Sequence, residues 1–85
     1  MEKIIYKVKD ELGIHTRPAG LLAKEARTYQ SAIVIGNGKR EVDAKKIIGI
    51  MSLGVKSGET ISLTIEGSDE VLAATKLKVF LEENL

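Results

Sequence analysis

The sequence predicts an α+β domain in which helices pack on one face of a β-sheet. Apolar and polar residues alternate strictly over residues 60–66, and less cleanly over 2–9, which is typical of half-buried strands. Apolar residues recur at helical spacing over 16–28 and again after Ser68. A turn signal at Gly36–Gly38 separates two further strand-like segments. Strands and helices therefore interleave along the chain.

Length and composition limit the possible functions. The 85 residues predict one domain, residues 1–85, with a core that is sufficient without disulfides or a structural metal. The absence of cysteine excludes disulfides and thiol chemistry, and it is compatible with the reducing cytoplasm where we expect the protein. No segment resembles a signal peptide or reaches the roughly 20 apolar residues of a membrane-spanning helix, so we expect no membrane insertion. The net charge of +1 argues against nucleic-acid binding.

The first strand is predicted over residues 2–9, where Ile4, Tyr6 and Val8 alternate with three lysines. Ile5 interrupts the polar face, which suits a sheet edge or a position under a loop. Residues 32–35 are apolar on both faces and predict a central strand. After the hairpin turn, residues 39–44 return as a strand with Val42 and Ala44 inward. The charged residues of that strand suit an exposed edge.

The helix over residues 16–28 has two different faces. One carries a small apolar stripe that should face the sheet, consisting of Pro18, Ala19, Leu22, Ala23 and Ala26. The other is basic but contains an apolar leucine: Arg17, Gly20, Leu21, Lys24 and Arg27. An ordinary solvated face with one stray leucine would explain this pattern. This basic face continues from His15, the only histidine of the chain, and that position favours a docking surface.

Residues 47–54 are apolar nearly all round. A short surface helix would place Ile50 and Leu53 in the core and leave Ile47, Ile48 and Met51 as an apolar patch that calls for a partner. A buried strand or connector is the alternative, and periodicity alone does not exclude it. After the strand over 60–66, Ser68 is predicted to cap a last helix, with Ala73, Leu77, Phe80 and Leu81 in the core.

The only histidine and the only proline lie three residues apart, at His15 and Pro18. Pro18 is typical of the first position of a helix. His15 and Thr16 then lie at the helix start, where unpaired N–H groups and the helix dipole bind phosphate. Arg17 adds a planar cationic fork. The arrangement suits a transient phosphohistidine, whereas the plainer interpretation of His15 is a polar loop residue.

Other chemistries find little support in the sequence. One histidine and scattered carboxylates do not form a metal site, and Gly36–Gly38 is a hairpin turn rather than a nucleotide-binding loop. We therefore expect no metal and no cofactor. A small RNA-binding module would need aromatic residues to stack on bases, and only Tyr6, Tyr29 and Phe80 are available.

Residues Leu12–Ala19 resemble the active-site signature of the HPr family, the histidine-containing phosphocarriers of the bacterial phosphoenolpyruvate-dependent sugar phosphotransferase system. Residues Lys45–Gly54 are similar to the second helix of that family and the turn after it, and the resemblance extends over essentially the whole chain. It implies an open-faced β-sandwich, with a four-stranded antiparallel sheet and three helices on one face in the order β-α-β-β-α-β-α. It also favours a short helix over 47–54.

The resemblance implies a function as well. HPr family members accept a phosphoryl group from phosphorylated enzyme I, on Nδ1 of the histidine that matches His15, and pass it to the A-domains of enzymes II. They are protein substrates rather than enzymes, and we expect a monomer. Phosphate contacts are expected from Thr16, Arg17 and Pro18. The docking surface would consist of Gly20, Leu21, Lys24, Arg27, Ile47, Ile48 and Met51.

Two related functions stay open. One is the nitrogen-related phosphotransfer branch, which has the same chemistry without sugar output. The other is a regulatory HPr-like binding protein, a group whose members lack the histidine. The chain departs from many Gram-positive members at one position, because Lys46 stands where those carry a serine that a dedicated kinase phosphorylates. The sequence therefore predicts that this serine switch is missing.

Overall fold

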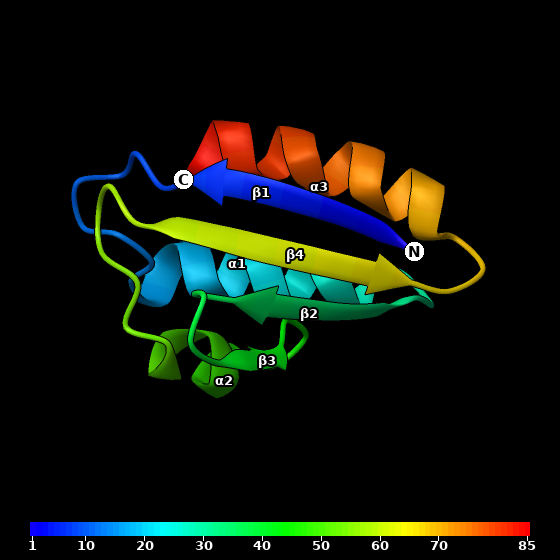
Figure 1. The fold of residues 1–85 in the computed structure, drawn as a ribbon, viewed down its shortest axis with the longest axis horizontal. Coiled ribbons are helices and arrows are strands. Elements are labelled where there is room, and N and C mark those ends of the chain that lie inside the picture. The colour runs from blue at the N-terminus through cyan, green and yellow to red at the C-terminus, as the bar shows by residue number, and fades with distance from the viewer.

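The computed structural model describes all 85 residues. The elements follow in the predicted order: β1 (Glu2–Lys7), α1 (Thr16–Arg27), β2 (Ala32–Gly36), β3 (Glu41–Asp43), α2 (Ile47–Ser52), β4 (Thr60–Glu66) and α3 (Glu70–Asn84). The four strands form one sheet in the order β1-β4-β2-β3, and every neighbouring pair is antiparallel (Figure 1). The predicted fold class is confirmed, including the short helix at α2.

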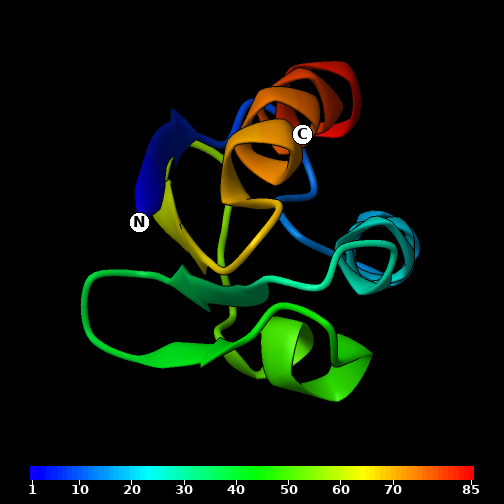
Figure 2. The same ribbon diagram turned by 90° about the vertical axis from the view of Figure 1, so that its right-hand side faces the viewer.

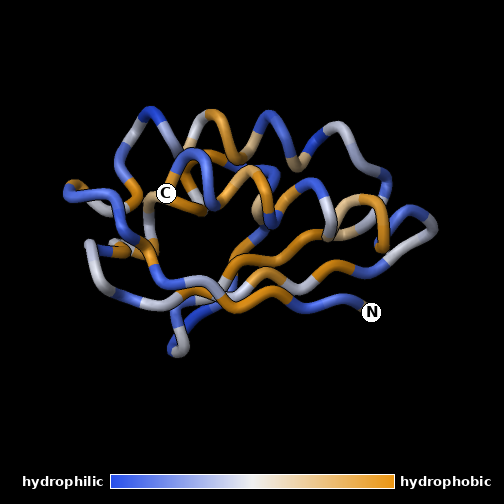
Figure 3. The backbone as a smooth tube through the Cα atoms, turned by 90° about the horizontal axis from the view of Figure 1, so that it is seen from above, coloured by the Kyte–Doolittle hydropathy of each residue, from blue (hydrophilic) through white to orange (hydrophobic).

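The helices lie on one side of the sheet and leave its other face open (Figure 2). Alternation in β4 sends Ile61, Leu63 and Ile65 into the core, where each side chain is at most 1 % exposed. The predicted stripe of α1 is buried in full, and α3 contributes Ala73, Leu77 and Leu81. The tube coloured by hydropathy changes repeatedly between hydrophilic and hydrophobic along both long helices (Figure 3). Burial of these apolar faces holds the two layers together.

The positions of the strands agree with their composition. β2 lies inside the sheet between β4 and β3, as its two apolar faces predict. β1 and β3 form the edges, and Ile5 points outward on β1 with 63 % of its surface exposed. Of the two expectations for Ile5, the sheet edge is therefore confirmed.

The hairpin between β2 and β3 is closed by the Asn37 side chain. Its Oδ1 accepts the backbone N–H groups of Lys39 and Arg40, and Gly38 adopts a positive φ of 92°. The returning strand is shorter than predicted, because pairing begins only at Glu41, opposite Gly36. Val42 is half-buried and Ala44 buried, as predicted.

The start of α3 differs from the prediction, since Asp69 rather than Ser68 is the N-cap residue. The Asp69 carboxylate accepts the N–H groups of Gln30 and Ser31, and its Oδ1 also accepts the Ser31 hydroxyl. These hydrogen bonds hold the pKa of Asp69 below its ordinary value, the Ser31 hydroxyl having the largest effect. Hydrogen bonds to the connection between α1 and β2 therefore hold Asp69 in place, and the helix is capped one residue later than predicted.

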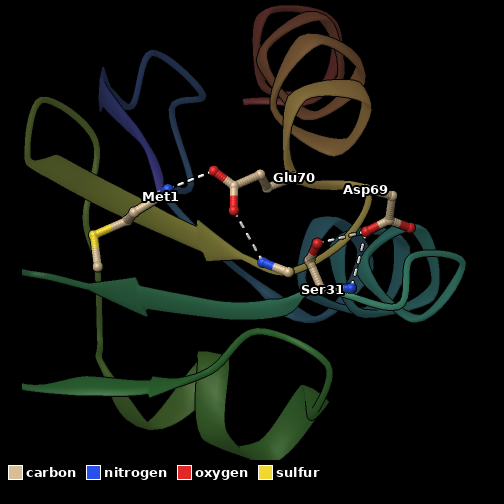
Figure 4. A network of polar contacts seen from close by, with 5 residues as sticks. Met1, Ser31, Asp69 and Glu70 are labelled. Carbon is tan, nitrogen blue, oxygen red and sulfur yellow. Dashed lines mark hydrogen bonds and ion pairs between the residues drawn. The ribbon is translucent and has the colours of Figure 1, made fainter.

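Glu70 completes a polar network at this end of the sheet (Figure 4). Its carboxylate pairs with the Met1 α-ammonium and accepts the Gly67 N–H at 3.1 Å. The network ties β1, the end of β4 and the start of α3 together. The loop that carries His15 follows the opposite end of β1 (Figure 1), so these contacts stabilise the fold at a distance from the candidate site.

Candidate functional site

A tightly bonded loop leads from β1 to the only histidine. Gly13 has a φ of 67°, and a Cβ atom there would lie 2.4 Å from the Val55 carbonyl oxygen, so only glycine fits. The Gly13 N–H donates to the Asp10 carbonyl at 2.9 Å, and the Ile14 N–H donates to the Val55 carbonyl at 3.0 Å. These bonds fix the backbone immediately before His15.

His15 is the N-cap residue of α1, with extended backbone angles. The helix begins at Thr16, so Pro18 occupies its third position; the prediction that Pro18 stands first was wrong. Proline is tolerated here because the first turn of a helix needs no N–H donor at this residue. The first helical bond runs from the Ala19 N–H to the His15 carbonyl, at 3.0 Å.

This position of Pro18 affects the imidazole of His15. An N-cap side chain ordinarily accepts the N–H of the second or third helical residue. The third residue here has no N–H, and the His15 ring forms no capping hydrogen bond. The N–H groups of Thr16 and Arg17 have no partner within the helix and lie at the positive end of its dipole. A ring nitrogen and two backbone donors are thus available at the same place.

The His15 side chain, 36 % exposed, lines an open pocket of about 250 Å³. The residues around it come from three segments of the chain: Asp10, His15, Arg17, Pro18, Leu21 and Asn84. The structure therefore brings His15, Arg17 and Pro18 together as predicted. Thr16 is exposed beside the pocket without lining it.

Asp10 and Asn84 were not identified from the sequence. Asp10 Oδ2 lies 3.8 Å from His15 Nε2. The end of α3 reaches the site because the Leu85 main-chain oxygen accepts the N–H groups of Lys9 and Asp10. A carboxylate five residues before the histidine was a visible signal for Asp10. Nothing in the local sequence of Asn84 indicates a site.

The proposed docking residues lie on α1 and α2, which pack against each other. Leu21 is 39 % exposed and Ile48 85 % exposed, whereas Ile50 and Leu53 are buried as predicted. The other expected members are exposed or half-buried: Gly20, Lys24, Arg27, Ile47 and Met51. Because Leu21 also lines the His15 pocket, this surface begins at the site itself.

Arg27 has a structural contact in addition to its exposed position. Its Nε donates to the Lys45 carbonyl at 2.9 Å, and Lys45 Nζ donates to the Tyr29 carbonyl at 2.8 Å. These bonds hold α1 against the segment that enters α2. Lys46 is exposed at the N-cap of α2 and makes no capping bond with its side chain.

The structure offers neither a cluster of metal ligands nor a helix suited to a bilayer. No group of three or more histidine, cysteine, aspartate or glutamate side chains is placed to hold a metal ion. None of the helices has both the length and the apolar character that crossing a bilayer requires.

A four-stranded open-faced sandwich with a histidine at the start of its first helix defines the class of histidine-containing phosphocarrier folds. The family model described as "PTS HPr component phosphorylation site" matches residues 3–83. The chain therefore belongs to the HPr family, the phosphocarriers of the phosphotransferase system, and the resemblance seen in the sequence is confirmed.

Individual relatives agree with this assignment. The chain is 40 % identical over 85 residues to the phosphocarrier protein HPr of Mycoplasma pneumoniae, covering 99 % of this chain and 97 % of the relative. It is 43 % identical over 77 residues to the HPr-like protein Crh of Halalkalibacterium halodurans, covering 91 % and 92 %. The crystal structure of HPr from Thermoanaerobacter tengcongensis superposes with a TM-score of 0.93 at 37 % identity, covering 99 % and 94 %. Crh of Bacillus subtilis, at a TM-score of 0.77 and 34 % identity, covering 94 % and 92 %, crystallised as a swapped dimer.

Proposed function

We propose that this protein carries a phosphoryl group on His15, receives it from phosphorylated enzyme I and passes it to the A-domains of enzymes II in the cytoplasm. The observation that carries the proposal is the helix start. Pro18 at the third position of α1 has no N–H to donate to the His15 ring. The Thr16 and Arg17 N–H groups remain free to bind an anion.

The geometry favours Nδ1 as the nucleophile. Nε2 faces the Asp10 carboxylate, which leaves Nδ1 as the nitrogen with a free lone pair. In the transfer, a bond forms between Nδ1 and phosphorus while the bond from phosphorus to the donor breaks, and the donor atom keeps that electron pair. The phosphoryl oxygens then accept hydrogen bonds from the backbone N–H groups of Thr16 and Arg17 and from the Arg17 guanidinium.

The shape of the pocket suits a carrier. A carrier must gain and lose the phosphoryl group at comparable free energies, so a deep cage would trap it. The pocket is open, and only one cationic side chain, Arg17, lines it. We infer that the protein is a substrate of its partner enzymes, acts as a monomer, and has no turnover of its own.

The regulatory HPr-like proteins are the principal alternative, because Crh of H. halodurans is about as similar to this chain as HPr of M. pneumoniae. His15 argues against this alternative, since a protein that only docks partners needs no nucleophile. The nitrogen-related branch would use the same site chemistry, and its partners would distinguish it.

The proposal is tested by incubating the chain with enzyme I and labelled phosphoenolpyruvate. We expect one acid-labile phosphate per chain in the wild type and none in His15→Ala. Circular dichroism should show that the variant still folds, because a half-exposed loop residue contributes little packing. Equal labelling of the variant and the wild type would refute His15 as the carrier residue, and an unlabelled wild type would refute the function.

A further inference from the structure

The Asp10 carboxylate uses its two oxygens differently. Oδ1 accepts the Leu12 N–H at 2.9 Å, while Oδ2 faces His15 Nε2 at 3.8 Å. The backbone of Asp10 is also fixed, because its N–H donates to the Leu85 oxygen and its carbonyl accepts the Gly13 N–H. The carboxylate therefore has a fixed orientation toward the ring, although its side chain is 32 % exposed.

Asp10 is the only acidic group that lines the pocket. Arg17, from α1, is the other charged group there, and α3 contributes only the uncharged Asn84. An ionised carboxylate accepts hydrogen bonds and cannot donate them, so it favours a proton on the nitrogen that it faces. The His15 tautomer with hydrogen on Nε2 and a lone pair on Nδ1 is therefore the one that Asp10 selects.

We propose that Asp10 is a positioning residue for His15, which holds the Nε2–H tautomer and stabilises the ring after Nδ1 has taken up a phosphoryl group. The inference rests on the proposed function and deepens it. When the Nδ1 lone pair attacks phosphorus, the Nε2 proton stays in place and the ring becomes positively charged. The negative carboxylate beside Nε2 stabilises the positively charged ring, as the aspartate of a serine-protease triad stabilises its histidine.

The stabilised cation also matters for release. As the phosphoryl group leaves for an acceptor, the electron pair of the Nδ1–phosphorus bond returns to the ring, which becomes neutral again. An imidazole protonated at Nε2 is the better leaving group, and Asp10 keeps that proton in place. The 3.8 Å separation is longer than a hydrogen bond, and such contacts often shorten when the charge that they serve develops.

Asp10→Asn isolates this role. Asparagine keeps an Oδ1 acceptor for the Leu12 N–H, so the turn and the side-chain orientation are preserved. The amide nitrogen then faces Nε2 as a donor, which favours a lone pair on Nε2 and a proton on Nδ1. Glu11→Gln is the matched control, because it removes one exposed negative charge from the adjacent residue, which does not line the pocket.

The first measurement is the nitrogen NMR spectrum of His15 in the unphosphorylated protein. We expect mainly the Nε2–H tautomer in the wild type and in Glu11→Gln, and a shift toward Nδ1–H in Asp10→Asn. A merely structural role for Asp10 would not move the tautomer ratio while the melting temperature stays constant. An unchanged ratio in Asp10→Asn would overturn the proposal.

The second measurement is the rate of phosphorylation, first by phosphoramidate and then by enzyme I. Phosphoramidate transfers its phosphoryl group to the ring with loss of ammonia and needs no partner protein. We expect Asp10→Asn to slow formation of the Nδ1 phosphoramide roughly three- to tenfold, far less than the approximately 10⁴-fold loss in the buried protease triad, because water screens this pair. A rate equal to that of Glu11→Gln would contradict the proposal.

The two experiments separate this inference from the proposed function. If enzyme I leaves the wild type unphosphorylated, the carrier function fails, yet the tautomer ratio and the phosphoramidate rate still report on Asp10. If enzyme I phosphorylates the wild type and Asp10→Asn equally fast with the same tautomer, the carrier function stands and the role of Asp10 is refuted.

Discussion

At the scale of single residues, Arg17 and Asp10 place opposite charges around one imidazole. Neither of the two ion pairs in the structure involves Arg17, so its guanidinium is free to bind an incoming anion. Asp10 has the opposite effect on the phosphoryl group, because its carboxylate repels that group while it stabilises a positively charged ring. The combination suits a group that must be held and then released.

Arg17→Ala should therefore slow phosphoryl transfer much more than it weakens folding. Removing one donor from a comparable oxyanion site raises the barrier by about 2.7–4 kcal/mol, or roughly 10²–10³ in rate. Rapid-quench kinetics of transfer from enzyme I and to an enzyme II A-domain measure the effect. Arg17→Lys, which keeps the charge but loses the planar fork, should recover part of the rate. Unchanged rates in Arg17→Ala would make the guanidinium a simple surface charge.

The sequence was sufficient for the residues that follow one another along the helix start. The placement of His15, Thr16 and Arg17 at the helix start was predictable, because unpaired donors at a helix start are a local property, and their roles in phosphoryl transfer stay predictions. Pro18 was placed two positions too early, since its fixed φ suits any residue of the first turn. Asn84 reaches the site only because the end of α3 meets the loop, and that packing has no local signature. Asp10 had a local signal in its place five residues before His15, but its orientation toward the ring depends on the same packing.

At the scale of elements, helical periodicity predicted the buried face of α1, whereas α2 needed the family resemblance to be chosen as a helix before Ile50 and Leu53 could define its buried face. Periodicity could not predict how the two helices lie against each other. That arrangement depends on contacts such as the bond from Arg27 Nε to the Lys45 carbonyl. Ser68 failed as a cap for the same reason, because Asp69 is held by Ser31 from a distant part of the chain.

The surface formed by α1 and α2 should be the docking face for enzyme I. Leu21→Glu and Ile48→Glu should each weaken binding by roughly 1–3 kcal/mol, because both place a charge in a desolvated apolar contact. Titration calorimetry against enzyme I measures the loss, and affinity should also fall with added salt because Lys24 and its basic neighbours steer the association. Val71→Glu is the matched control, since Val71 is 66 % exposed on α3. Wild-type affinity in both docking variants would move the interface elsewhere.

Lys46 at the N-cap of α2 should leave the protein without a serine-kinase switch. It has no hydroxyl to modify, whereas a phosphate there would add about −1.5 to −2 charges beside the docking face. HPr kinase with ATP should leave the wild type unmodified, and Lys46→Ser should create a substrate; mass spectrometry decides both. A stoichiometric phosphoserine on the wild type would contradict the prediction. Equal affinity of Lys46→Ala and wild type for enzyme I at low salt would show that Lys46 has no docking role.

At the scale of the whole molecule, the strand order was the part that spacing could not supply. Alternation identified β1 and β4 as strands, yet β1 is paired with β4 across more than fifty residues of chain. The family resemblance predicted four antiparallel strands with the helices on one face, and the structure adds the order β1-β4-β2-β3. The edge position of β3 was easier to predict, because its charged residues suit a strand that faces water, whereas Ile5 left β1 either at an edge or under a loop.

The position of β1 at an edge bears on the oligomeric state, and we expect the protein to sediment as a monomer at micromolar concentration. Exchange of β1 between two copies would reproduce the same β1–β4 pairing, so only the hinge and the entropy of association distinguish the two forms. The hinge is closed here by the bonds from Leu12 N–H and Gly13 N–H to Asp10, and an extended hinge would lose both. The closed monomer is therefore favoured.

Gly13→Ala should shift the balance toward an exchanged dimer, because a Cβ there lies 2.4 Å from the Val55 oxygen and φ is 67°. Gly58→Ala has a similarly positive φ of 87° but open space around its Cβ and no place in the hinge, so it should stay monomeric. A wild type that sediments as a dimer, or a Gly58→Ala that dimerises as readily as Gly13→Ala, would show that the hinge does not control the assembly.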